Sequence, residues 1–193
     1  MAAEKKVIVL TAGDVPLDGG AACQKFTKKA AHFVNYAAED VTASIAALEG
    51  ATKVAPEALA ETFEGGASLA LVELGNATGD VLEAALAAAL EAADRRTLTV
   101  LAAANGLYFY GHGINAKAGS VERAATAADV IPTIGYIADV PVPADTTGAV
   151  LYQALKDPNM KMKELAKLKD ALNRMETALQ RDNREPWDKH DCA

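Results

Sequence analysis

Short apolar runs alternate with helical patterns from residue 5 to residue 138 of the chain. The runs are rich in aliphatic residues and are bounded by Gly, Pro, Asn or Asp, which is typical of buried β-strands. They are residues 5–12, 68–74, 97–104 and 107–114. Only Asn105-Gly106 separates the last two runs, and this dipeptide favours a tight hairpin, so we expect these two strands to pair antiparallel.

Apolar residues that recur at intervals of three and four predict the helices. Such patterns cover residues 26–48, as one long or two short helices, and then residues 56–63, 81–96, 129–138 and 159–181. Pro56 and Pro132 fall in predicted first turns, where the missing N–H costs little, and Asp129 is a predicted cap. Strands that alternate with helices predict an α/β three-layer sandwich with a mostly parallel sheet, an antiparallel edge strand and an appended C-terminal amphipathic helix.

Length and charge restrict the class of protein. The chain has 193 residues and a net charge of −7, and residues 1–155 hold 10 Lys and Arg against 18 Asp and Glu. We therefore expect an α/β body, residues 1–155, followed by a C-terminal helix and tail, residues 156–193. An acidic body repels phosphate backbones, so nucleic acid is not an expected partner.

Membrane insertion, secretion and disulfide bonding are not expected either. The most apolar stretches are short and carry Glu73 and Glu91, so no segment is expected to span a membrane or to bind one. The apolar run near the N-terminus is shorter than a signal-peptide core, which favours a cytoplasmic location. Cys23 and Cys192 lie far apart in the sequence, so we expect two unrelated thiols.

Four segments of the chain follow one another in an order that resembles a known family. They are SLALVELGN, LTVLAAANG, LYFYGHGINAKAG and ERAATAADVIPTIGYIADVPVPADTTG. Together they resemble the C-terminal half of the alkaline phosphatase superfamily, which includes sulfatases, nucleotide pyrophosphatases and metal-dependent phosphosugar mutases. The resemblance covers residues 66–150 and is closest over residues 123–148, and it implies the α/β fold of that family.

The resemblance also implies a site with one or two divalent metals, and this chain departs from it at most ligand positions. The family has an Asp after its first strand, whereas residues 11–13 here are Thr-Ala-Gly. Ala104 and Asn105 stand where the family has an Asp-His pair. A zinc hydrolase needs about three protein ligands. We therefore expect a degenerate, non-catalytic protein without a cofactor, which acts as an interaction module or accessory subunit.

Two alternatives use the same end of the sheet. One is a metal-dependent phosphate- or sulfate-ester hydrolase with a rebuilt site, in which oxygen donors hold Mg²⁺, Mn²⁺ or Zn²⁺. Its candidate ligands come from three loops and are Asp14, Asp18, Asn76, Asp80 and Asn105. The other alternative is a small-molecule binder that uses this crevice without chemistry.

Asp14 and Cys23 are the candidate catalytic residues. Cys23 stands near a predicted helix N-terminus, where the helix dipole favours a thiolate and where the resemblance implies a nucleophile. A buried structural cysteine is the other interpretation of this position.

An apolar stripe marks the C-terminal helix as a partner-binding element. Its members recur at intervals of three and four among charged residues and are Leu165, Leu168, Leu172, Met175 and Leu179. Such a stripe is expected to be buried, either on the protein's own body or on a partner, which can be a second copy or another protein.

Overall fold

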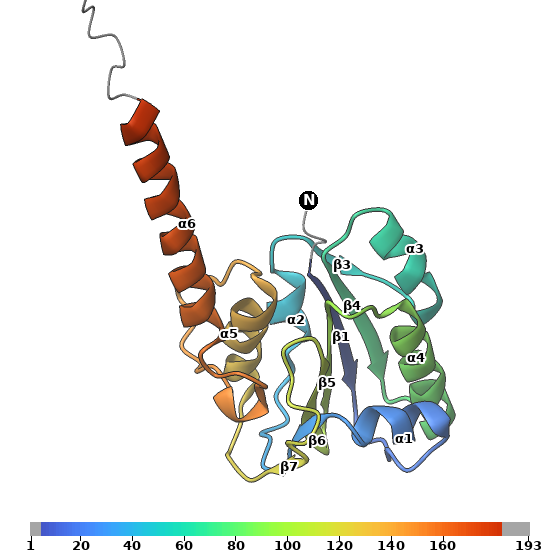
Figure 1. The fold of residues 1–193 in the computed structure, drawn as a ribbon. Coiled ribbons are helices and arrows are strands. Elements are labelled where there is room, and N and C mark those ends of the chain that lie inside the picture. The colour runs from blue at the N-terminus through green and yellow to red at the C-terminus, as the bar shows by residue number, and fades with distance from the viewer. Residues whose placement is uncertain (1–4, 183–193) are drawn as a thin grey trace, which may run out of the picture. The chain divides into compact units, whose positions relative to one another are not determined.

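A mixed sheet between two layers of helices makes up most of the chain (Figure 1). This fold comes from a computed structural model, which describes residues 5–182. The chain divides into two units, one that ends at Pro158 and one that begins at Asn159. The strands are β1 (Lys6–Ala12), β2 (Ala31–Phe33), β3 (Ala51–Lys53), β4 (Leu69–Gly75), β5 (Thr97–Ala103), β6 (Gly106–Gly111) and β7 (Ser120–Val121). The helices are α1 (Ala21–Thr27), α2 (Thr42–Ala46), α3 (Leu59–Glu64), α4 (Gly79–Ala92), α5 (Ala127–Ala138) and α6 (Met160–Asp182), with 3₁₀ turns at Pro56–Ala58 and Tyr152–Ala154.

Within the described residues, seven strands form one sheet in the order β3-β4-β1-β5-β6-β2-β7. All neighbours pair parallel except at β6, which pairs antiparallel with both β5 and β2. The predicted hairpin is confirmed, since Ala103 pairs with Gly106 across the turn. The predicted α/β class, with its mostly parallel sheet and C-terminal helix, is confirmed as well. The antiparallel strand lies inside the sheet, because β2 and β7 extend the sheet beyond it.

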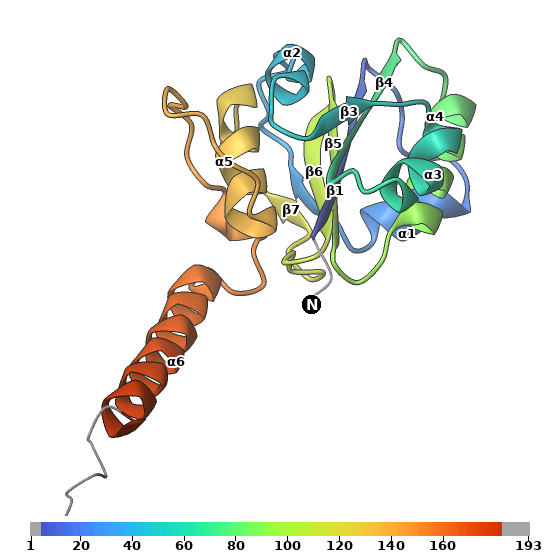
Figure 2. The ribbon, with the colours of Figure 1, turned by 90° about the horizontal axis from the view of Figure 1, so that it is seen from above.

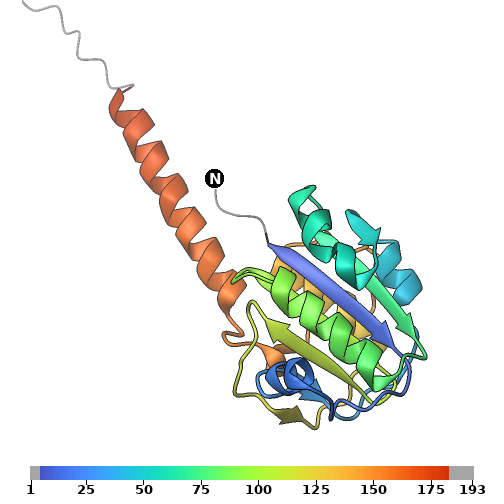
Figure 3. The same ribbon diagram turned by 90° about the vertical axis from the view of Figure 1, so that its right-hand side faces the viewer.

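Helices cover both faces of the sheet. α1, α3 and α4 lie on one face and α2 and α5 on the other (Figure 2), and Figure 3 shows α4, in green, lying along the strands. In β1, Val7 and Val9 face α2 and α5. Ile8 and Leu10 face α1, α3 and α4. All four side chains are fully buried. A strand that is buried on both faces reads as a continuous apolar run, which explains the pattern at residues 5–12.

The predicted helical pattern over residues 26–48 is wrong at its centre. α1 ends at Thr27, and residues 31–33 form β2, which pairs with β6. His32 therefore lies in a strand, where its ring stacks on Tyr108 with 4.0 Å between ring centroids. Three residues are too few to display an alternating pattern, and the pairing with β6 overrides the helix propensity of the alanines around them. The sequence does not predict the short strands β3 and β7 for the same reason.

Residues 123–148, where the resemblance to the family is closest, form hydrogen bonds that hold the chain together around α5. α5 begins two residues earlier than predicted, and Thr126 rather than Asp129 is its N-cap. The Asp129 carboxylate instead accepts a hydrogen bond of 2.9 Å from the Thr126 N–H. The other oxygen of Asp129 accepts a 2.7 Å hydrogen bond from the Ala149 N–H. Gly148 has no room for a Cβ, which would overlap the Ala128 carbonyl. The chain after α5 is thus fastened back onto the first turn of that helix.

No helix within residues 5–182 is long and apolar enough to cross a membrane. Cys192 and the tail around it lie outside the described residues.

Candidate functional site

A crevice of about 670 Å³ lies where β1, β4 and β5 end. Backbone hydrogen bonds join the three loops that follow these strands: the Gly13 N–H donates to the Gly75 carbonyl at 2.7 Å, and the Ala104 N–H donates to the Gly13 carbonyl at 3.2 Å. A Cβ on Gly13 would lie 2.7 Å from Asn76 Oδ1, so a larger residue here would displace the Asn76 side chain. Open α/β sheets bind ligands at this edge, so the crevice is the candidate site.

Acidic and neutral side chains line this crevice. Glu39, Asp40 and Glu73 contribute carboxylates, and no Lys, Arg or His occurs among the described residues that line it. Glu73 forms an ion pair with Lys53. Hydrogen bonds from the hydroxyl and the N–H of Thr42 hold the pKa of Asp40 below its ordinary value. The crevice therefore presents negative charge, which repels a phosphate or sulfate ester that has no cation beside it.

The remaining polar groups of the crevice bind one another. Burial, with the charges of Glu39 and Asp40, raises the pKa of Tyr36 to about 12, so its hydroxyl stays protonated and donates to the Glu39 carbonyl at 3.3 Å. The hydroxyl oxygens of Thr42 and Thr11 lie 3.3 Å apart and share a hydrogen bond. This arrangement offers hydroxyl groups and carboxylates, which suit a neutral or cationic ligand better than an anion.

The structure does not bring the predicted oxygen ligands together at this crevice. Asn76 lines it, whereas Asp14, Asp18 and Asp80 do not and are exposed. Within residues 5–182, no three His, Cys, Asp or Glu side chains gather in a group that could hold a metal ion. The rebuilt metal site, with Asp14 as a catalytic residue, stays a prediction.

Asn105 takes part in loop structure. Its side-chain amide donates a 2.9 Å hydrogen bond to the carbonyl of Val15, in the loop that follows β1. Ala104, its neighbour, lines the crevice with only a methyl group. Of the two residues that stand where the resemblance has an Asp-His pair, Asn105 thus connects two loops, and Ala104 offers the crevice no metal-binding group.

Cys23 is the third residue of α1 and is buried. The carboxylate of Glu83, from α4, accepts hydrogen bonds from the N–H groups of Ala22 at 2.7 Å and Cys23 at 2.9 Å. Burial, and the Glu83 carboxylate beside the thiol, raise the pKa of Cys23 to about 12. The thiol is therefore protonated at neutral pH, and an internal carboxylate takes the place that an anionic ligand would have at this helix N-terminus.

Sequence reasoning missed Glu83. Its position on α4 beside the buried Leu82 marks it only as a residue next to an apolar face. The available signal is the Gly19-Gly20 pair before α1, which leaves space for a group from elsewhere: a Cβ on Gly20 would lie 2.6 Å from Glu83 Oε1. Nothing in the local spacing shows which residue fills that space.

The apolar stripe of α6 is uncovered. Its five side chains are between 56% and 66% exposed, and Met162 is 66% exposed; the five are Leu165, Leu168, Leu172, Met175 and Leu179. Exposed apolar side chains aligned along one helix face are typical of an interaction surface. We call these five residues the α6 stripe.

No family model, no curated protein and no solved structure matches this chain.

Proposed function

We propose that this chain is a non-catalytic, cytoplasmic protein with an alkaline-phosphatase-like core, which acts as an interaction module through α6. The arrangement of the core supports the first part. The loops to which the resemblance assigns metal ligands meet at one crevice, yet they contribute Gly13, Asn76 and Ala104 to it. These residues offer one amide oxygen among them, whereas a catalytic zinc needs about three N, O or S donors and an open position.

The charges at the end of the sheet that holds the crevice also support a non-catalytic protein. Glu83 binds the N-terminus of α1, and Cys23 beside it is a protonated thiol at neutral pH. The carboxylates of Glu39, Asp40 and Glu73 line the crevice. Anionic esters are therefore repelled by the crevice and find no free helix N-terminus at α1.

The α6 stripe is the observation that carries the proposal. Five large apolar side chains on a helix of 23 residues are each more than half exposed. Burying such a side chain stabilises an assembly by about 1.5–3 kcal/mol. A protein that presents this surface gains stability by association.

A second copy of α6 is the partner that the charges favour. Lys169 and Glu176 directly follow stripe residues Leu168 and Met175, so they flank the contact between two helices that pack stripe to stripe. In an antiparallel pair, Lys169 faces the partner's Glu176; in a parallel pair, Lys169 faces the partner's Glu164. Within the described residues, Lys169 and Glu176 form no ion pair. Both orientations thus place opposite charges across the seam.

Sedimentation equilibrium of the full chain tests the association. We expect a dimer at micromolar concentration, and we expect Leu172→Asp, at the centre of the stripe, to be monomeric. Asn173→Asp introduces the same charge at the next position, off the stripe, and is expected to leave the dimer intact. A wild-type chain that is monomeric at high concentration, or an L172D variant that still dimerises, would contradict the proposal.

Metal analysis and an activity assay test whether the protein lacks a metal site and hydrolase activity. The purified protein is expected to contain no stoichiometric metal and to hydrolyse neither p-nitrophenyl phosphate nor p-nitrophenyl sulfate. Stoichiometric zinc, manganese or magnesium, with ester hydrolysis that a chelator abolishes, would instead establish the hydrolase alternative.

A further inference from the structure

A second cavity, of about 410 Å³, lies at the opposite end of the sheet, where β5 begins and β6 ends. Three basic side chains line it, and they are Lys25, Lys29 and Arg95. Leu90, Ala93 and Ile114 contribute an apolar part of the lining, beside Tyr110 and His112. The combination of cations and apolar surface distinguishes this cavity from the acidic crevice at the other end.

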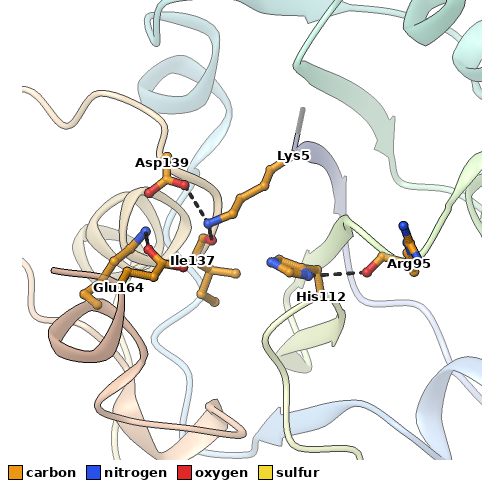
Figure 4. A network of polar contacts seen from close by, with 7 residues as sticks. Lys5, Arg95, His112, Ile137, Asp139 and Glu164 are labelled. Atoms are coloured by element: carbon orange, nitrogen blue, oxygen red, sulfur yellow. Dashed lines mark hydrogen bonds and ion pairs between the residues drawn. The ribbon is translucent and has the colours of Figure 1, made fainter. Parts of the chain in front are cut away.

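The basic groups of this cavity have no ion-pair partner in the part of the chain that the structure describes. Within residues 5–182, the side chains of Lys25, Lys29 and Arg95 take part in no ion pair. Lys5, by contrast, binds both the carboxylate of Asp139, at 2.5 Å, and the carbonyl of Ile137, at 3.0 Å (Figure 4). The cavity therefore carries an excess of positive charge, with three cations against one carboxylate in its lining, in a chain whose net charge is −7.

Asp94 is the acidic residue of this lining, and its carboxylate is already engaged. Oδ1 accepts hydrogen bonds from the Arg96 N–H at 2.7 Å and from the Thr97 hydroxyl at 3.0 Å. Oδ2 lies 3.4 Å from the ammonium group of Lys6. These contacts, the Arg96 N–H first, hold the pKa of Asp94 below its ordinary value. Its carboxylate therefore pairs with Lys6, which is a fourth cation, and the lining of the cavity keeps a net positive charge.

The walls of the cavity are held in place. The ring of Tyr110 stacks on Phe26 with 5.3 Å between centroids. The N–H of His112 donates to the Thr97 carbonyl at 2.8 Å, and its ring Nδ1 lies 3.3 Å from the Arg95 carbonyl (Figure 4). The two ring side chains of the lining are thus positioned before a ligand enters, which lowers the entropy lost by this part of the site on binding.

We propose that this cavity binds a small organic anion that carries two negative charges and a compact apolar group. Arg95 and the two lysines bind the charged end through charge-assisted hydrogen bonds, in which a guanidinium can take two oxygens at once. The apolar group lies against Leu90 and Ile114. A cavity of this volume lies in the range of small-ligand sites, about 300–1,000 Å³. Phosphate monoesters and dicarboxylates share this chemistry.

An NMR titration of the full chain at low ionic strength tests the proposal, with phenyl phosphate and phthalate as the two dianions. We expect saturable shifts of backbone amides in residues 25–29, 95 and 110–114 with at least one of the two probes. Residues 11–13, in the crevice at the other end of the sheet, are expected not to shift. Inorganic phosphate, which lacks an apolar group, is expected to bind more weakly than the better of the two probes.

Two charge-removing variants separate the cavity from general surface charge. Arg95→Gln is expected to weaken binding about 10- to 100-fold, the range for a lost hydrogen bond to a charged group. Lys28→Gln removes an exposed charge of α1's C-cap that does not line the cavity, and it is expected to leave binding unchanged. The proposal is overturned if neither dianion saturates these amides, if K28Q weakens binding as much as R95Q, or if inorganic phosphate binds as tightly as the better probe.

Discussion

Glu83 Oε2, on α4, accepts a hydrogen bond of 2.9 Å from the backbone N–H of Cys23, on α1. Oε1 of the same carboxylate accepts a second hydrogen bond, of 2.7 Å, from the N–H of Ala22. One side chain thus satisfies two of the N–H groups that a helix leaves unpaired at its first turn. It also joins two neighbouring helices on the same face of the sheet.

Replacing Glu83 by Gln is expected to destabilise the protein at neutral pH. The neutral amide loses the attraction between a carboxylate and the N-terminus of α1. We expect the melting temperature to fall by a few degrees at pH 7, as measured by circular dichroism. Glu91→Gln, a charge-matched change at an exposed position of α4, is expected to leave the melting temperature within a degree or so.

The pH dependence of this effect has a defined sign. The N–H groups of Cys23 and Ala22 hold the pKa of Glu83 below its ordinary value of 4.5. The stabilisation is therefore fully present above pH 4.5 and is lost as the pH falls through the lower pKa of the folded state. Wild type and E83Q are expected to converge in melting temperature well below pH 4.5. A difference that persists unchanged in acid would contradict a role for the carboxylate charge.

Cys23 is expected to resist alkylation in the folded protein. With its pKa raised to about 12, only about 10⁻⁴ of the thiol is ionised at pH 8, which is roughly a thousandth of the ionised fraction of an ordinary thiol. Iodoacetamide labelling followed by mass spectrometry, in a Cys192→Ser background, measures this rate. The additional E83Q change removes the neighbouring negative charge and is expected to accelerate labelling. A wild-type Cys23 that reacts as fast as a free thiol would contradict the assigned environment.

How far the sequence predicts the fold depends on how long each element is. β1 is recognisable because seven residues, buried on both faces, form a continuous apolar run. β2 is not recognisable, because it has only two fully buried residues, Ala31 and Phe33. Together with the apolar residues before them, Phe26 and Ala30, these two residues fit a helical pattern equally well. Its strand conformation follows from pairing with β6, far along the chain, which no local pattern encodes.

The candidate sites depend on contacts between residues that lie still farther apart in the sequence. The sequence locates the loops after β1, β4 and β5, and parallel pairing then brings Gly13, Gly75 and Ala104 together. It does not reveal that Glu83 binds α1, since the two groups are 60 positions apart in the chain and no spacing rule joins them. The same limit hides the basic cavity, where Lys25 and Arg95 come from separate helices and loops.

Thr133→Val is expected to destabilise the protein by about 1–3 kcal/mol. The Thr133 hydroxyl is fully buried, donates to the Asp129 carbonyl at 2.6 Å and accepts from the Leu151 N–H at 3.0 Å. Valine has nearly the same shape, so the change leaves the buried Leu151 N–H without its acceptor. Urea unfolding measures the loss. Faster hydrogen exchange at the Leu151 amide is the local readout.

Thr52→Val is the matched control for that change. Thr52 is exposed on the edge strand β3, so its replacement by Val is expected to alter stability by no more than about 0.5 kcal/mol. Equal effects at Thr52 and Thr133 would show that the buried hydroxyl does not fasten the chain after α5.

Reversing the charge of Lys169 is expected to weaken the dimer in either orientation. Lys169 faces an acidic residue in both, so Lys169→Glu turns two symmetric attractions into repulsions. At roughly 0.2–1 kcal/mol for each exposed pair, the loss of two attractions raises the dimer dissociation constant about 2- to 30-fold at low salt, and the repulsion between the new like charges adds to this increase. Sedimentation equilibrium measures this constant, and high salt is expected to reduce the difference by screening.

A second substitution then identifies the orientation. Adding Glu176→Lys restores an attractive pair only between antiparallel helices, whereas adding Glu164→Lys restores one only between parallel helices. We therefore expect one of the two double variants to recover the wild-type dissociation constant. The other is expected to remain weak, since the carboxylate introduced by K169E still faces an unchanged acidic residue of the second copy. If K169E dimerises like wild type, or if neither double variant recovers, the two copies do not meet along the α6 stripe.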